Sequence, residues 1–263
     1  MNNNISNDEF LRKRALRQKK IRKRRIKIFF VFFMILSLLV GVTLCLTVFF
    51  PIKNLDFYGS KLYTEFEILE ASDIEKGDNL FTVQKSKIEQ KLKKKLPYIE
   101  GIELERELPD TLRVKVIDAE EYSSYFIKAK YYIVSESGWV LKTTREKPQN
   151  IFTILGAKVE CKVGQNIEFK DDELKELTMS LTKTLNQSEI KINSIDISNP
   201  LSIMLQVEDR FDVKVGTANY IEEKIRHLSS MIDEIDESLQ GEINLSMWTN
   251  DNSQSSFIPI NRQ

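Results

Sequence analysis

The chain has 263 residues, with 39 basic and 39 acidic side chains, one histidine and two cysteines. A single histidine excludes metal sites built on a His pair and leaves no credible Ser/His/Asp or Cys/His catalytic set. The zero net charge conceals an asymmetry, because residues 1–27 hold 11 basic and 2 acidic residues, a net charge of +9, which leaves −9 for residues 28–263.

The first element in chain order is an apolar run, from Ile28 to Ile52, in which no side chain carries a charge. A bilayer core about 30 Å thick needs about 20 apolar helical residues, so the run predicts a single transmembrane helix over residues 28–52. Short loops rich in Lys and Arg stay in the cytoplasm, which predicts a basic cytoplasmic tail at residues 1–27 and a type II orientation. A cleaved signal peptide is disfavoured, because Thr47-Val48-Phe49-Phe50-Pro51 offers no small-x-small cleavage site.

The basic tail has two possible ligands. Positive charges beside a membrane attract anionic lipid headgroups, at about 1 kcal/mol per residue. Nucleic acid is not expected, because no aromatic residues alternate with the basic ones to stack on bases. We therefore expect the tail to set the topology and to contact anionic lipids.

The segment after the apolar run predicts a small domain over residues 53–121. Thr64 followed by Glu67 is a capping box, which indicates that a helix begins there. Apolar residues at four-residue spacing predict a second helix, and two alternating runs beyond Pro97 predict two strands. The expected elements are a strand at 55–58, a helix at 64–71, a helix through Ile88, Leu92 and Leu96, and strands at 102–105 and 112–116. The order β-α-α-β-β favours an α+β fold, a three-stranded sheet with two helices on one face.

Three pieces of this segment together resemble a known domain. They are Gly77-Asp78-Asn79-Leu80-Phe81, Leu96-Pro97-Tyr98-Ile99, and the run from Leu104 to Val116 that contains Leu108-Pro109-Asp110. Their order and spacing, directly after a predicted type II anchor, resemble the POTRA domain of the bacterial cell division family FtsQ/DivIB. The resemblance continues more weakly to about residue 247.

Residues 122–249 predict a second α+β domain, extracytoplasmic, with a mixed or antiparallel sheet. A hairpin is expected at 131–141 around Ser135-Glu136-Ser137-Gly138, where Gly accepts a positive φ. Leucines on one face predict a helix over 171–186, and a second helix is expected from Ile221 to Leu239. Strands are expected at 195–197, 201–207, 211–215 and 242–247. Residues 250–263 are polar and aperiodic, which predicts a disordered tail.

The sequence favours a protein that is not an enzyme and that needs no cofactor. His227 lies within the expected 221–239 helix, where a structural role is favoured over a catalytic one. Asp171-Asp172 and Glu222-Glu223 lie at helix starts, where capping and the helix dipole explain them. Cys161 is the only cysteine outside the apolar run, so no internal disulfide is expected there, and a small buried residue is favoured over a reactive thiol.

The family resemblance implies a noncatalytic scaffold of the division machinery, located at the septum of the cell membrane. It implies binding to the bitopic coiled-coil proteins FtsL and FtsB or DivIC, and through them a link to the synthases of septal peptidoglycan. In the family a partner strand docks beside the last strand of the second domain. The matching residues here are Asn244, Leu245, Ser246, Met247, Trp248, Thr249 and Asn250.

Three points stay open from the sequence. Trp248 is either an interface anchor or a residue that closes the core. A membrane-anchored envelope sensor or anti-sigma factor is the alternative function, although residues 1–27 offer little apolar surface for holding a regulator. A POTRA protein that serves outer-membrane transport fits poorly, because no barrel-forming sequence follows.

Overall fold

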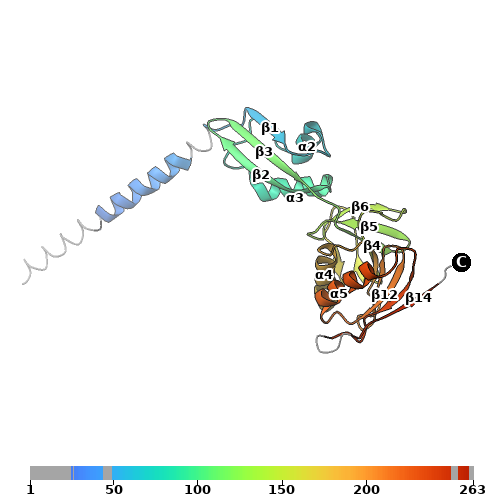
Figure 1. The fold of residues 1–263 in the computed structure, drawn as a ribbon. Coiled ribbons are helices and arrows are strands. Elements are labelled where there is room, and N and C mark those ends of the chain that lie inside the picture. The colour runs from blue at the N-terminus through green and yellow to red at the C-terminus, as the bar shows by residue number, and fades with distance from the viewer. Residues whose placement is uncertain (1–24, 26, 44–48, 250–253, 261–263) are drawn as a thin grey trace, which may run out of the picture. The chain divides into compact units, whose positions relative to one another are not determined.

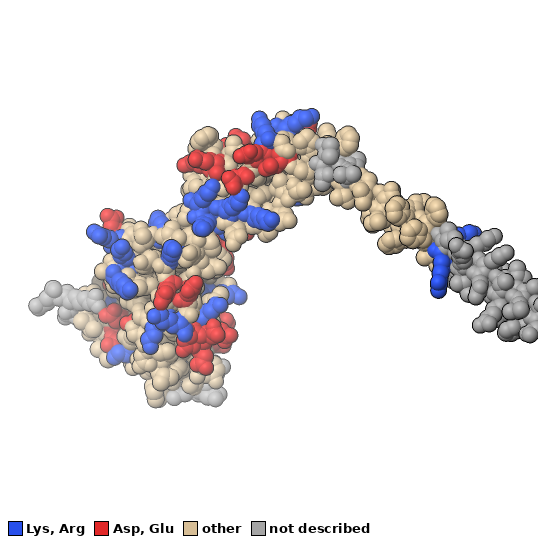
Figure 2. All heavy atoms as spheres, turned by 180° about the vertical axis from the view of Figure 1, so that it is seen from behind, with Lys and Arg blue, Asp and Glu red and all other residues tan. Residues whose placement is uncertain are grey.

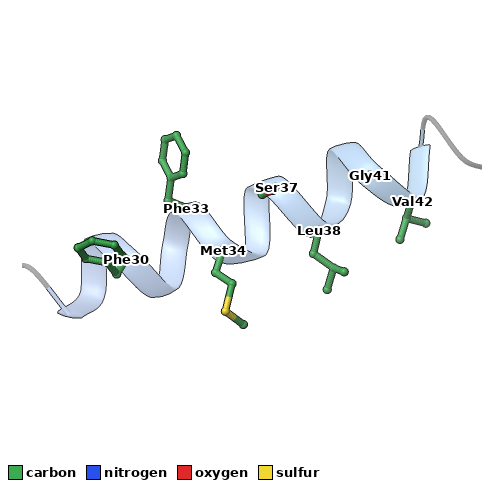
Figure 3. A pocket seen from close by; sticks show the side chains of 7 residues that line it. All are labelled: Phe30, Phe33, Met34, Ser37, Leu38, Gly41 and Val42. Carbon is green, nitrogen blue, oxygen red and sulfur yellow. The ribbon is translucent and has the colours of Figure 1, made fainter.

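The computed structural model describes residues 25, 27–43, 49–249 and 254–260. Residues 27–43 are helical and exposed. Figure 3 shows that Met34, Leu38 and Val42 project from one side of this helix at four-residue spacing, whereas Phe33 projects from the other side. Within the described ranges, no helix combines the length and the apolar character needed to cross a bilayer.

The end of the predicted membrane helix needs a correction. Residues 44–48 lie outside the described part of the chain, and residues 49–52 are not helical. Pro51 forms an isolated β-bridge with Asn79, and the amide of Ile52 donates to the carbonyl of Asp78 at 2.7 Å. Ile52 is only 1% exposed, so it belongs to the core of the domain that follows. The apolar run in the sequence therefore contains two separate features: a helix, and Ile52, a core residue of the domain that follows.

The first domain has the expected order of elements. They are β1 (Asn54–Tyr58), α2 (Glu65–Ser72), α3 (Lys85–Lys95), β2 (Ile99–Glu107) and β3 (Thr111–Asp118). The strands form a three-stranded sheet in the order β1-β3-β2, and α2 and α3 lie beside it (Figure 1). The β-α-α-β-β prediction is thus confirmed for this part of the chain.

Local sequence explains these elements. Thr64 caps α2, because its Oγ1 accepts from the amide of Glu67 at 3.3 Å while the Glu67 carboxylate accepts from the amide of Thr64 at 2.8 Å. This reciprocal pair satisfies free amides of the first turn. Alternation along β3 buries one side of the strand, with Leu112, Val114 and Val116 at most 2% exposed. The domain is therefore built as the pattern predicts, with one apolar sheet face.

The second domain contains a mixed sheet, two helices and a small ribbon. Its strands are β4 (Ser123–Ile127), β5 (Lys130–Val134), β6 (Val140–Thr144), β7 (Thr153–Leu155), β8 (Val159–Glu160), β9 (Glu168–Phe169), β10 (Ile192–Asp196), β11 (Ile203–Val207), β12 (Phe211–Gly216), β13 (Gly241–Asn244) and β14 (Ser256–Pro259). Its helices are α4 (Asp172–Asn186) and α5 (Ile221–Glu234). Nine strands form one sheet in the order β14-β13-β12-β11-β10-β7-β4-β5-β6, and β8 pairs with β9.

The sheet is mixed because three of its strand pairs are parallel: β4 with β7, β7 with β10, and β12 with β13. The helices α4 and α5 lie together beside the sheet (Figure 1). Their buried leucines and isoleucines share one hydrophobic cluster with the inward residues of the strands. The mixed α+β prediction is confirmed, whereas the sequence pattern gave no sign of β4, β7, β8 or β9.

Candidate partner-binding site

The predicted site begins at the end of β13, beside β12 in the large sheet. β13 runs parallel to β12, with Asn244 opposite Lys214. The side-chain oxygen Oδ1 of Asn244 then accepts from the amide and the hydroxyl of Ser246, at 3.0 and 2.7 Å. Such a turn reverses the chain. Only Asn244 of the predicted residues is therefore in a strand, and the expected strand over 242–247 ends early.

The chain turns at Ser246 and Met247, and the described residues from Leu245 to Thr249 have two kinds of side chain. Leu245 is fully buried and its amide donates to the carbonyl of Lys214 at 2.8 Å, so it is a core residue. Ser246, Met247 and Thr249 are exposed. Asn250 lies outside the described residues. The structure thus places Ser246, Met247 and Thr249 at the surface and the side chain of Leu245 in the core.

The other edge of β13 is occupied by the chain's own C-terminal segment. β14 pairs with β13 antiparallel, from Gly241 opposite Pro259 to Asn244 opposite Ser256. The ring of Phe257 meets that of Phe211 edge to face, with centroids 6.0 Å apart. The prediction of a disordered tail is therefore wrong for Ser256–Pro259. A four-residue strand has too few positions to show alternation, so pairing with β13 decides its structure.

Gly241 allows this close approach. A Cβ placed on Gly241 would lie 2.2 Å from the carbonyl oxygen of Ile258 and 2.9 Å from the ring of Phe257. Both distances are shorter than any side chain tolerates, so only glycine fits opposite β14 at this position.

Three rings meet beside the turn. Trp248 stacks on His227 of α5, with centroids 6.1 Å apart and an interplanar angle of 29°, and Tyr220 meets Trp248 edge to face at 6.4 Å. The Nε2 atom of His227 also lies 3.0 Å from the hydroxyl of Ser255, just before β14. Trp248 is half-buried against the core, and its buried Nε1 has no hydrogen-bond partner among the described residues. His227 thus joins α5, the turn and the start of β14.

Tyr220 is a site residue that the sequence pattern did not indicate. It precedes α5 with φ 57° and ψ 34°, the left-handed region, and its side chain makes no capping hydrogen bond. For a residue other than Gly this conformation costs about 1 to 2 kcal/mol. Tyr220 is nevertheless 48% exposed, so its ring is held beside Trp248 and open to solvent. Strain of this kind clusters at functional sites, which makes Tyr220 a candidate contact residue.

Large apolar side chains are exposed at this same end of the sheet. Leu201 is 76% and Met247 is 67% exposed. Ile203, at the start of β11, pairs with Gly216, and a Cβ on Gly216 would lie 3.1 Å from Ser246. The segments that carry Leu201, Tyr220 and Met247 therefore lie next to one another. We call Leu201, Tyr220 and Met247 the apolar end surface. Exposed apolar groups that gather in this way are typical of contact sites.

A buried lysine supports the loop that carries Tyr220. The Nζ atom of Lys224 donates to the carbonyls of Val215 and Thr217, each at 2.9 Å, and the residue is 2% exposed. Burial lowers the pKa of Lys224, because the charged form loses its hydration. The two carbonyl contacts tie the first turn of α5 to the end of β12.

The residues considered for chemistry have structural roles in this fold. Asp171 caps α4 by accepting from the amides of Glu173 and Leu174. Burial raises the pKa of Cys161 to about 11, so the thiol is protonated at neutral pH and a poor nucleophile. No cluster of three or more His, Cys, Asp or Glu residues suited to a metal ion occurs within the described ranges. On the face that Figure 2 shows, basic and acidic residues are interspersed over the folded part of the chain.

Comparison with known proteins identifies the first domain. Residues 50–118 match the family model described as "POTRA domain, FtsQ-type". The chain carries an FtsQ-type POTRA domain. The predicted boundary at residue 53 excluded Pro51 and Ile52, which the structure places in this domain.

Relatives of known role extend the likeness beyond the POTRA domain. The cell division protein DivIB of Clostridium botulinum strain Hall is 28% identical over 249 residues, which cover 92% of this chain and 94% of the relative. DivIB of Clostridium acetobutylicum is 27% identical over 196 residues, 73% of this chain and 77% of the relative. The cell division protein FtsQ of Streptomyces coelicolor is 24% identical over 103 residues, 39% of each chain.

One solved structure similar to this chain is the major extracytoplasmic domain of the trans isomer of DivIB from Geobacillus stearothermophilus. The match covers 47% of this chain and 99% of that one, with 16% identity and a TM-score of 0.30. The family match and the curated relatives confirm the resemblance to FtsQ and DivIB that the sequence motifs indicated.

Proposed function

We propose that this chain is a noncatalytic, membrane-anchored scaffold of the bacterial division machinery. Its relatives along most of its length are cell division proteins, which supports a role in division. Its partners would be FtsL-like and FtsB-like or DivIC-like bitopic coiled-coil proteins, and through them the septal peptidoglycan synthases. It would assemble with them at the septum by contact alone.

The anchor is proposed from the sequence. Residues 28–52 carry no charge, and the described helix within them exposes apolar side chains on all sides. A helix that is apolar all round is suited to a membrane. The 11 basic residues before it would hold the N-terminus in the cytoplasm and contact anionic lipids, leaving both domains extracytoplasmic.

The observation that carries the proposed binding mode is the pairing of β14 with β13. It supports the idea that this edge accepts an extended segment in antiparallel register. β14 is short: its Phe257 packs against the core, whereas its Ile258 is 58% exposed, so burial holds the segment mainly through one ring. We infer that a partner strand replaces β14 beside β13, and that the predicted site at residues 244–250 contacts the residues next to that strand. The apolar end surface and Trp248 would then receive the partner's side chains.

A crosslinking experiment tests this site. A photoreactive benzoylphenylalanine at Met247 should crosslink to the coiled-coil partner in dividing cells. The matched control is the same group at Phe126, which is 39% exposed on β4, far along the sheet order from β13. Equal crosslinking at both positions, or crosslinking at Phe126 alone, would place the partner elsewhere.

Two experiments in cells test the wider role. A fluorescent fusion of the full chain should form a septal band, and an even distribution around the envelope would contradict a division role. Exchange of residues 1–48, which leaves Phe50, Pro51 and Ile52 in the first domain, for an unrelated type II anchor should preserve function, because the domains behind the anchor make the contacts. Loss of function on that exchange would favour a sensor that signals through its cytoplasmic segment.

A further inference from the structure

A second site lies apart from the β13 edge, in a cavity of the second domain. The cavity has a volume of about 620 Å³. Its walls are the start of β4, the turn over residues 135–138, the loop over residues 166–169 and one face of α4. Ligand pockets in proteins span about 300 to 1,000 Å³, so the cavity is large enough for a ligand.

One buried hydroxyl of the cavity wall lacks a partner. Ser123 lines the cavity and is 1% exposed, and its Oγ makes no hydrogen bond to any described residue. Its neighbour Ser124 differs, because its hydroxyl lies 3.0 Å from that of Thr153. Buried polar groups are nearly always paired, so an unpaired hydroxyl in a cavity wall is a donor available to a ligand.

The mouth of the cavity carries an excess of positive charge. Lys175, Met179 and Lys183 follow one another at four-residue steps along α4, so they share one helix face. In the part of the chain that the structure describes, neither Lys175 nor Lys183 makes an ion pair or a side-chain hydrogen bond. The only carboxylate among the lining residues is that of Glu136. The lining thus holds two cations and one anion, together with apolar side chains that include those of Met179 and Ile167.

We propose that this cavity binds an acidic, extended peptide segment of a partner protein. Carboxylates of the segment would pair with Lys175 and Lys183, and an apolar side chain between them would lie on Met179. A main-chain carbonyl of the segment would accept the hydrogen bond from Ser123. The proposal rests on the cavity, its unpaired hydroxyl and its charge, and it does not depend on strand docking at β13.

Calorimetry tests the charge preference. The full chain in phosphatidylcholine nanodiscs is titrated with acetyl-Glu-Ser-Leu-Ser-Glu-amide, whose two carboxylates and leucine share one face when the peptide is extended, and with its uncharged counterpart acetyl-Gln-Ser-Leu-Ser-Gln-amide. The glutamate peptide should bind at least tenfold more tightly. The double variant Lys175→Gln/Lys183→Gln should abolish that difference, whereas Lys147→Gln, an exposed lysine outside the cavity, should preserve it. Equal binding of the two peptides, or no binding of either at millimolar concentration, would overturn the proposal.

Ser123→Ala separates a ligand role from a structural one. The variant should weaken the glutamate peptide about 2- to 12-fold, the equivalent of one hydrogen bond. The unliganded variant should be as heat-stable as the parent chain or more so, because an unpaired buried hydroxyl is removed. A lower melting temperature would show that Ser123 is paired within the unliganded protein, and would contradict its assignment to a ligand.

Discussion

Gly241→Ala is expected to detach β14 from β13 while it leaves the rest of the sheet intact. The new Cβ would lie 2.2 Å from the carbonyl oxygen of Ile258, and ordinary contact begins at 3.4 Å, so the strands must separate by about 1.2 Å. The opposing atom belongs to the main chain, and no rotamer change can relieve the clash. The hydrogen bond from the amide of Ile260 to the carbonyl of Gln240, now 2.8 Å, would lengthen to about 4 Å.

The magnitude follows from the bonds at risk. Loss of two or three strand hydrogen bonds, at about 0.5 to 1.5 kcal/mol each, would remove about 1 to 4 kcal/mol of local stability from β14. Hydrogen exchange of the full chain, followed by mass spectrometry, should show faster exchange over residues 256–260 and unchanged exchange in β11 and β12. If residues 256–260 stay as protected as in the parent chain, the close approach at Gly241 does not hold β14.

Three further substitutions test the fold and the site. Thr64→Ala should cost about 1 kcal/mol in urea unfolding through loss of the α2 cap. The amide of Thr64, which the substitution keeps, and its hydroxyl, which the substitution removes, both lower the pKa of Glu67. The hydroxyl's stabilisation is present above the unfolded pKa and lost as pH falls through the folded pKa; the cost should therefore shrink in acid, and an undiminished cost would contradict this. Lys224→Met should lower stability by about 1 to 3 kcal/mol, because two buried carbonyls lose their donor, and an unchanged urea midpoint would contradict the role of Lys224. Trp248→Ala should weaken capture of the coiled-coil partner while Phe126→Ala does not, and equal affinities would exclude Trp248 as an anchor.

The sequence predicted those parts of the fold that local patterns determine. Thr64 with Glu67 placed the start of α2, and the spacing of Ile88 and Leu92 placed α3, because capping and helical periodicity act within a few residues. The strand β7 escaped prediction, since its three residues are held by parallel pairing with β4 and β10, which are distant in sequence. A short window of sequence does not show which distant segment a strand will pair with.

The candidate site was predicted only in part, for similar reasons. Trp248 stood out by residue type, but the buried position of Leu245 depends on its place against β12. Tyr220 gave no signal, because a left-handed backbone at a residue other than Gly cannot be inferred from its side chain. The same holds for β14, whose structure depends on Gly241 and on the edge it covers.

The replacement of β14 by a partner strand is tested most directly by the affinity of the coiled-coil partner for the chain with and without residues 254–263. If β14 occupies the partner's place beside β13, the full chain binds only in the fraction of molecules whose β14 is detached. Pairing worth about 1 to 4 kcal/mol would then hide about 5- to 900-fold of affinity. We predict that the truncated chain, in nanodiscs, binds the extracytoplasmic segment of the partner more tightly by a factor in that range. Unchanged or weaker binding would contradict the replacement of β14 by a partner strand.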